Sequence, residues 1–154
     1  MRRSMPRAIS AACTGLVSSS SVSRVGRARP PAMSIIGPDV IALQVRDLEV
    51  SASFYEEVLG LRRAAASPPG AVVFATAPIP FAVREPLSGV DLEGTDRPGL
   101  GIALWLRADD VAAVREALDA AGRPILRDLA PSPFGLTLTF ADPEGYAITL
   151  HDQG

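Results

Sequence analysis

The sequence predicts an α+β fold made of two copies of one unit, each a strand, a helix and then about three more strands. The first observation is that residues 41–60 and 101–122 both run from an aliphatic strand, through an Asp that can cap a helix, to a Gly that can end it. The second is that the two copies align: Asp47 with Asp110, Leu48 with Val111, and Gly60 with Gly122 after one gap. The similarity is weak residue by residue but clear as a pattern, which indicates an internal repeat.

In the first copy, residues 41–45 (IALQV) predict a strand. Asp47 can cap the helix that follows, and Gly60 stands where a glycine commonly ends one. Its apolar residues recur at helical spacing: Leu48, Ala52, Tyr55 and Leu59. Residues 71–76 and 81–84 are two short strand candidates. The segment between them contains Pro78 and Pro80, which cannot pair inside a sheet.

In the second copy, residues 101–107 (GIALWLR) predict a strand, and Asp109 or Asp110 can cap the next helix. The apolar stripe of that helix is Val111, Val114, Leu118 and Ala121. Residues 124–127 are a short strand candidate, and residues 131–135 (PSPFG) predict a loop. Residues 136–140 and 146–151 flank the tetrapeptide DPEG at 142–145, whose composition is typical of a type I turn, so they predict a hairpin.

The chain divides into two kinds of sequence. Residues 1–38 contain six arginines and no acid, whereas the remainder has nine arginines against 17 acids. We expect residues 1–36 to be a disordered extension and residues 37–152 to be one domain, with modules at about 37–86 and 99–152. The extension has the composition of an organellar transit peptide, but the favoured interpretation is that translation begins at Met33. A secretory signal or a lipoprotein site at Cys13 is a weaker fit, because the apolar stretch is short and interrupted.

Composition excludes several classes of function. The net charge of −2 over 154 residues gives no basic surplus for nucleic acid, and no apolar run is long enough to cross a membrane. A single Cys allows no internal disulfide, and a single His allows no multi-histidine metal site. We expect a cytoplasmic protein with no nucleic-acid or membrane partner and no cofactor.

Three motifs resemble those of one superfamily. They are VRDLEVSASFYEEVLGL at 45–61, LWLRADDVAAVREALDAAG at 104–122 and FADPEGYAITL at 140–150. In this order, with the internal repeat, they are similar to the glyoxalase/bleomycin resistance/extradiol dioxygenase (vicinal oxygen chelate) superfamily. The resemblance implies two βαβββ modules whose mixed sheets curl into a cup with the helices outside. It also implies a homodimer in which sheets of both chains line the cavities.

The resemblance places metal ligands at positions that here hold Val40, roughly Val83, Ala103 and Thr149. None of these side chains binds a divalent metal well. Shifting the alignment by one residue brings in only Asp39, which lies on the opposite strand face. The sequence therefore resembles the metal-free, bleomycin-resistance-like branch, and the metal-dependent mechanism of the family is not expected.

Strand alternation indicates which side chains face the cup. If Leu43 and Val45 pack under the helix, then Val40, Ala42 and Gln44 face the cup, and Ala103, Trp105 and Arg107 do so in the second copy. His151 is expected on the same side. Further candidate walls are Phe81, Val83, Phe134 and Tyr146. The candidate ligand-binding residues are thus Trp105, Phe81, Phe134, Tyr146, His151, Gln44 and Arg107. The alternatives stay open that Trp105 is core and that Arg107 and His151 are ordinary surface residues.

Two functions follow from these candidates. One is a metal-free protein that sequesters an aromatic or amphipathic ligand in an apolar cup, for which no catalytic residue is needed. The other is a lyase, isomerase or dioxygenase with a divergent or metal-free site, in which His151 or Tyr146 serves as acid or base. An accessory domain that acts only in a complex has no positive feature in its favour.

Overall fold

The computed structural model describes residues 35–153. The predictions for the N-terminal segment, including the start at Met33, fall on residues 1–34 and lie outside the described residues. The remainder forms a unit from Ile36 onward. None of its helices is long and apolar enough to pass through a bilayer.

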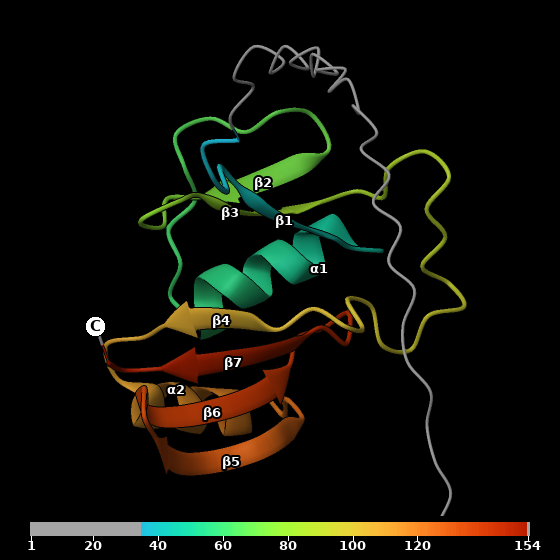
Figure 1. The fold of residues 1–154 in the computed structure, drawn as a ribbon. Helices are drawn as coiled ribbons and strands as arrows, with labels where there is room; N and C mark the ends of the chain where they lie inside the picture. The colour runs from blue at the N-terminus through green and yellow to red at the C-terminus, as the bar shows by residue number, and fades with distance from the viewer. Residues whose placement is uncertain (1–34, 154) are drawn as a thin grey trace, which may run out of the picture. The chain divides into compact units, whose positions relative to one another are not determined.

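The first module contains a three-stranded sheet (Figure 1). β1 (Ile41–Gln44) pairs in parallel with β3 (Phe81–Arg84), and β3 pairs antiparallel with β2 (Ala71–Phe74). A bridge between Arg63 and Phe74 adds a short further segment beside β2. The repeat predicted about three strands after the helix. The structure has two, β2 and β3, and this bridge at Arg63 stands in the place of the remaining one.

The helix of the first module begins and ends where its sequence predicts. α1 (Leu48–Ser53) is capped by Asp47, whose carboxylate accepts a hydrogen bond from the backbone N–H of Val50 at 2.9 Å. It continues as a turn of π-helix, η1 (Phe54–Val58), which the sequence pattern did not predict. Gly60 follows with φ +72°, a left-handed conformation that glycine adopts without strain.

The second module contains a four-stranded sheet in the order β4-β7-β6-β5 (Figure 1). Its strands are β4 (Leu104–Arg107), β5 (Ile125–Ser132), β6 (Gly135–Ala141) and β7 (Ala147–His151). β4 pairs in parallel with β7, and the other pairs are antiparallel. α2 (Val111–Ala120) lies behind this sheet in the figure and is capped by Asp110 rather than Asp109. Strand, helix and strands thus occur twice, as the resemblance implied.

One predicted loop is wrong. Residues 131–135 do not precede a hairpin; they close one, because β5 extends to Ser132 and pairs with Gly135 across the turn Pro133–Phe134. The Ser132 hydroxyl donates to the carbonyl of Gly135 at 2.9 Å and accepts from the N–H of Phe134 at 3.0 Å. The sequence suggested a loop because of Pro131, but β5 is an edge strand, where proline is tolerated.

The core lies on the helix-facing side of each sheet. Leu43 on β1 and Val45 just after it are 9% and 0% exposed and share a buried cluster with Ala52 of α1, whereas Ala42, which precedes them, is exposed. In β7, Ile148 and Leu150 are buried against the second helix. The modules meet through Phe54 of η1, whose ring lies 6.0 Å from that of Phe140 on β6. The face of the four-stranded sheet opposite α2 carries the exposed Trp105 and the half-buried Thr149 and His151, and we call it the open face of that sheet.

Polar contacts join the modules around the turn between β6 and β7. The Tyr55 hydroxyl, fully buried, donates to Asp142 at 2.7 Å. The guanidinium of Arg46 forms an ion pair with Glu144 at 2.9 Å. Burial raises the pKa of Asp142 although Tyr55 and the backbone N–H groups of Glu144 and Tyr146 donate to its carboxylate. Burial also raises the pKa of Tyr55 well above its ordinary value.

Candidate functional site

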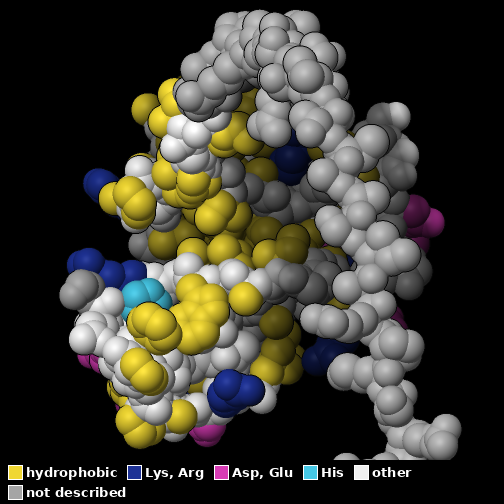
Figure 2. Space-filling view, viewed as in Figure 1, with side chains coloured by type: hydrophobic (Ala, Val, Ile, Leu, Met, Phe, Trp, Pro, Cys, Tyr) yellow, Lys and Arg dark blue, Asp and Glu magenta, His cyan; other side chains and the backbone are white. Residues whose placement is uncertain are grey.

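Three aromatic side chains gather on the open face of the four-stranded sheet. Trp105 lies on β4, His151 on the neighbouring β7, and Phe134 in the β5–β6 turn. The ring centroids of Trp105 lie 5.5 Å from Phe134 and 6.1 Å from His151, and those of Phe134 and His151 are 6.4 Å apart. Trp105 is 44% exposed and Phe134 56%. Figure 2 shows His151, in cyan, beside a group of hydrophobic side chains. We call these three residues the aromatic cluster.

Strand register explains why Trp105 and His151 share this face. β4 and β7 run parallel, with Trp105 opposite Thr149 and Arg107 opposite His151. Trp105 and Arg107 therefore point away from α2. Leu104 and Leu106, which alternate with them along β4, pack on the core. Trp105 is exposed, so the alternative that it is simply a core residue is wrong.

A pocket of about 330 Å³ adjoins the aromatic cluster. One side is the segment between β2 and β3, Thr76–Pro80, and the other is formed by the ends of β4 and β7. Its lining residues are Ile41, Leu61, Thr76, Ala77, Pro78, Ile79, Pro80, Phe81, Trp105, Leu106, Arg107 and His151. We call it the Trp105 pocket. Its volume is that of a site for a small organic molecule.

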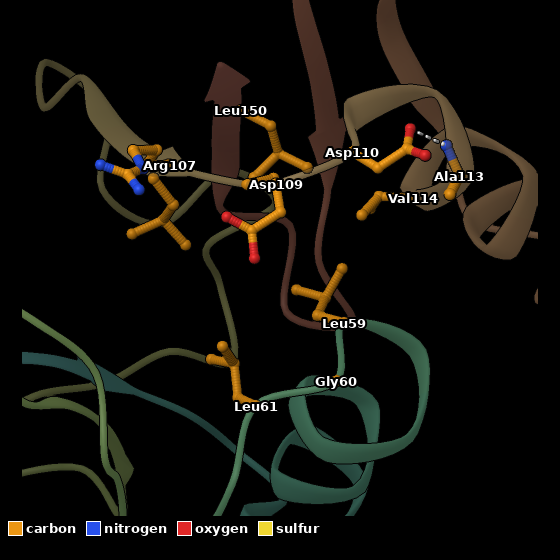
Figure 3. Close-up of a pocket in the computed structure, with 11 residues that line it drawn as sticks. Leu59, Gly60, Leu61, Arg107, Asp109, Asp110, Ala113, Val114 and Leu150 are labelled. Carbon is orange, nitrogen blue, oxygen red and sulfur yellow. Dashed lines mark hydrogen bonds between the residues drawn. The ribbon is translucent and has the colours of Figure 1, made fainter. Parts of the chain in front are cut away.

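A second pocket, of about 420 Å³, lies between the end of η1 and the start of α2 (Figure 3). Leu59 and Leu61 contribute apolar walls, and the carboxylate of Asp109 points into the hollow between them and Arg107. Asp110 turns away, toward the backbone N–H of Ala113 that it caps at 2.9 Å. This pocket shares Leu61, Leu106 and Arg107 with the Trp105 pocket.

Four of the candidate residues thus lie close together: Trp105, Phe134, His151 and Arg107. Gln44 and Tyr146 lie elsewhere. The side-chain oxygen of Gln44 accepts from the backbone N–H of Leu87 at 2.6 Å, and the Tyr146 hydroxyl donates to the Gln44 carbonyl at 2.9 Å. Tyr146 lines a separate pocket of about 140 Å³, and burial raises its pKa. Its phenol therefore serves as a donor between the modules and not as a group of the aromatic cluster.

Phe81 is mainly a core residue that also lines the Trp105 pocket, and its contact with a ligand stays a prediction. Phe81 is 2% exposed, and its ring packs 4.9 Å from that of Tyr55 and 6.1 Å from that of Phe74. It belongs to the core under the first helix and meets the Trp105 pocket only at its inner wall. Val83, a further candidate wall, is fully buried and does not line this pocket. Because β3 pairs in parallel with β1, Phe81 and Val83 stand opposite Ile41 and Leu43 and share the helix-facing side.

The positions to which the resemblance assigns metal ligands do not fit a divalent metal. Val83 is buried in the core, and Val40 and Ala103 are exposed without a donor atom. The Thr149 hydroxyl is hydrogen-bonded to that of Thr139 at 2.9 Å. Within residues 35–153, no three His, Cys, Asp or Glu side chains are grouped so that they could hold a metal ion.

The sequence did not single out the segment Thr76–Pro80 or Leu61 as lining residues. Pro78, Ile79 and Pro80 were recognised as a break between strands, which is correct, but their closeness to β4 depends on how the two modules pack. The available signal was an apolar Ile between two prolines, in a place where a solvent-exposed turn would favour polar residues.

Three comparisons bear on the family. The model of the Glyoxalase/Bleomycin resistance protein/Dioxygenase superfamily matches residues 37–150. A lactoylglutathione lyase of Haemophilus influenzae is 31% identical over 114 residues, which cover 69% of this chain and 84% of that protein. Among solved structures, a glyoxalase-related enzyme from Fulvimarina pelagi has a TM-score of 0.62 at 30% identity, covering 77% of this chain and 89% of its own. TnmS3, an antibiotic-binding protein from Streptomyces sp. CB03234, has a TM-score of 0.61 at 24% identity, covering 80% and 100%.

Proposed function

Because the chain belongs to the glyoxalase/bleomycin resistance protein/dioxygenase superfamily, we propose that it is a metal-independent protein that binds an aromatic or amphipathic small molecule. The observation that carries the proposal is the aromatic cluster of Trp105, Phe134 and His151, partly exposed beside a pocket of about 330 Å³. Large aromatic side chains left open next to a concave site are typical of ligand contacts. Within the same fold, TnmS3 is an antibiotic-binding protein.

The geometry suits a planar ligand. Trp105 and Phe134 meet edge to face, at 67° between their ring planes, so a ring that stacks on one contacts the edge of the other. Fully burying an aromatic side chain contributes about 1.5–3 kcal/mol, and roughly half of each ring is exposed, so covering both contributes about 1.5–3 kcal/mol in total. We therefore expect removal of the Trp105 ring to weaken binding about tenfold.

The binding test uses the single Trp of the chain. Aromatic natural-product-like compounds are titrated while Trp105 fluorescence is followed, and compounds that bind are measured again by calorimetry with Trp105→Ala and Trp105→Phe. We expect Trp105→Ala to lose affinity and Trp105→Phe to keep most of it. Leu126→Ala is the matched control, because Leu126 is equally exposed, at 46%, but lies on the outer strand β5. Equal losses for Trp105→Ala and Leu126→Ala, or no saturable binding at all, would contradict the proposal.

The second candidate is a lyase, and the similarity to a lactoylglutathione lyase favours it. The resemblance implies that this reaction is metal-dependent, and the side chains at the expected ligand positions do not fit a metal. Elemental analysis of protein purified without chelator separates the two functions. Zn, Ni, Mn or Fe at one equivalent, together with lyase activity, would favour the enzyme.

We also propose a homodimer, in which a second copy faces the open sheet face and lines the ligand cavity together with it. The exposed apolar side chains on and beside the strands support it, among them Val40 at 51%, Trp105 at 44% and Phe134 at 56%. Sedimentation equilibrium tests it, and a monomer at micromolar concentration would count against it. Cytoplasmic location stays a prediction from sequence, which cell fractionation can check.

A further inference from the structure

The Trp105 pocket has a charge that differs from the rest of the domain. Its twelve lining residues include two ionisable ones, Arg107 and His151, and no carboxylate. Residues 37–154 as a whole carry nine arginines and 17 acids. Asp109 and Asp110 line the other pocket, which also includes Arg107, but neither carboxylate forms an ion pair with Arg107 within residues 35–153. The Trp105 pocket is thus a basic site in an acidic domain.

Arg107 has no counter-ion among the described residues. The ion pairs of this part of the chain involve Arg46, Arg63 and Arg115, and no hydrogen bond from the Arg107 side chain is formed. Within residues 35–153 the five N–H donors of the guanidinium are therefore available to a ligand.

His151 is the second polar group of the pocket, directly opposite Arg107 in the β4–β7 pairing. Its Nδ1 is buried and has no hydrogen-bond partner within the described residues. A neutral imidazole avoids an unpaired buried N–H by carrying its proton on Nε2. In that tautomer Nε2–H is a donor and the acceptor Nδ1 is buried, so Arg107 and His151 both carry donors for a ligand.

We infer that the ligand of the Trp105 pocket is an aromatic acid: a planar apolar body with one anionic group, a carboxylate or sulfonate. This inference rests on the proposed function and names its ligand class. The apolar body lies between Trp105 and the segment Pro78–Pro80, which contribute no charge. The anionic group lies at the Arg107 end, where guanidinium donors match a carboxylate or sulfonate.

The test compares two fluorescent probes that differ by one anionic group. They are 8-anilinonaphthalene-1-sulfonate and N-phenyl-1-naphthylamine, the same skeleton without the sulfonate. Dissociation constants are measured from probe fluorescence with the full chain and with Arg107→Gln. The matched control is Arg127→Gln, because Arg127 is exposed on the same sheet, on β5, and does not line this pocket. Thermal unfolding checks that all three proteins are equally folded.

We expect the sulfonate probe to bind about tenfold more tightly than the neutral probe, as an ion-paired hydrogen bond implies. Arg107→Gln should remove this preference by weakening the sulfonate probe alone, and Arg127→Gln should leave it unchanged. Three results would overturn the inference. They are equal binding of the two probes by the wild type, a preference for the sulfonate probe that survives Arg107→Gln, and loss of this preference with Arg127→Gln as well. In each case the proposed function still stands if Trp105→Ala weakens the neutral probe. If Trp105→Ala affects neither probe, the proposed function itself fails.

Discussion

Replacing Tyr55 by Phe should destabilise the domain because it removes a buried hydrogen bond between the modules. The hydroxyl donates to Asp142 at 2.7 Å from a fully buried position. A hydrogen bond to a charged group contributes about 1.5–3 kcal/mol. Asp142 keeps two backbone donors, the N–H groups of Glu144 at 3.0 Å and Tyr146 at 2.8 Å, so we expect a loss of about 2 kcal/mol. For a domain of about 120 residues this lowers Tm by about 8 °C.

The destabilisation caused by Tyr55→Phe should depend on pH, and the ionisation of Asp142 sets the direction of this dependence. Burial raises the pKa of Asp142 above its ordinary 3.8, so the folded protein holds this proton more tightly than the unfolded chain, and stability falls as pH rises through that window. The bond from Tyr55 favours the ionised form, so its removal raises the pKa further. The penalty of Tyr55→Phe is therefore full near pH 7 and smaller near pH 4.

Tyr146→Phe is the matched control, because the chain has two Tyr and this one donates to a neutral carbonyl from a partly exposed position. Its cost should be about 0.5–1.5 kcal/mol and independent of acid pH. Differential scanning calorimetry of the wild type and both variants between pH 4 and pH 8 measures these effects. Equal Tm losses for the two variants at pH 7, or a Tyr55→Phe penalty that does not change with pH, would refute the reasoning.

Three further predictions concern caps, turns and alkaline stability. Asp110→Ala should cost about 1 kcal/mol by urea unfolding, because Asp110 caps α2, whereas Asp109→Ala should cost under 0.5 kcal/mol. Gly122→Ala should destabilise the domain by about 1–2 kcal/mol, because Gly122 has a positive φ that alanine adopts only with strain. Gly145→Ala should cost more, because Gly145 also has a positive φ and its added Cβ would lie 2.8 Å from a backbone oxygen. Equal losses of stability for the two variants would show that this close contact costs nothing. Because burial raises the pKa of Tyr55 above that in the unfolded chain, stability should fall as pH rises above about 10, and Tyr55→Phe should flatten this fall in denaturant titrations at pH 9–11.

The repeat, both helix caps and the closing hairpin could be predicted because each depends on local sequence. Asp47, Asp110 and Gly60 act within one turn of their own helix. The placement of Trp105 also followed from alternation along β4, since one buried neighbour fixes which side the others face.

What could not be predicted depends on pairing between strands far apart in sequence. Phe81 and Val83 alternate correctly along β3, but only the register with β1 shows that they share the face of Leu43. Phe134 joins the aromatic cluster because β5 is longer than its composition suggested, which turns a predicted loop into a hairpin tip. Tyr146 was assigned to the cup, and its hydroxyl instead reaches β1 of the other module.

The contacts at the β6–β7 turn have a consequence for the ancestry and engineering of this chain. Asp142 and Glu144 belong to the second repeat, yet their partners Tyr55 and Arg46 belong to the first. Two halves that share one pattern have thus become mutually dependent through residues that have no counterpart between the copies. A chimera that joins the second half of this chain to the first half of a relative would leave the buried carboxylate of Asp142 without its donor unless Tyr55 were transplanted together with the turn.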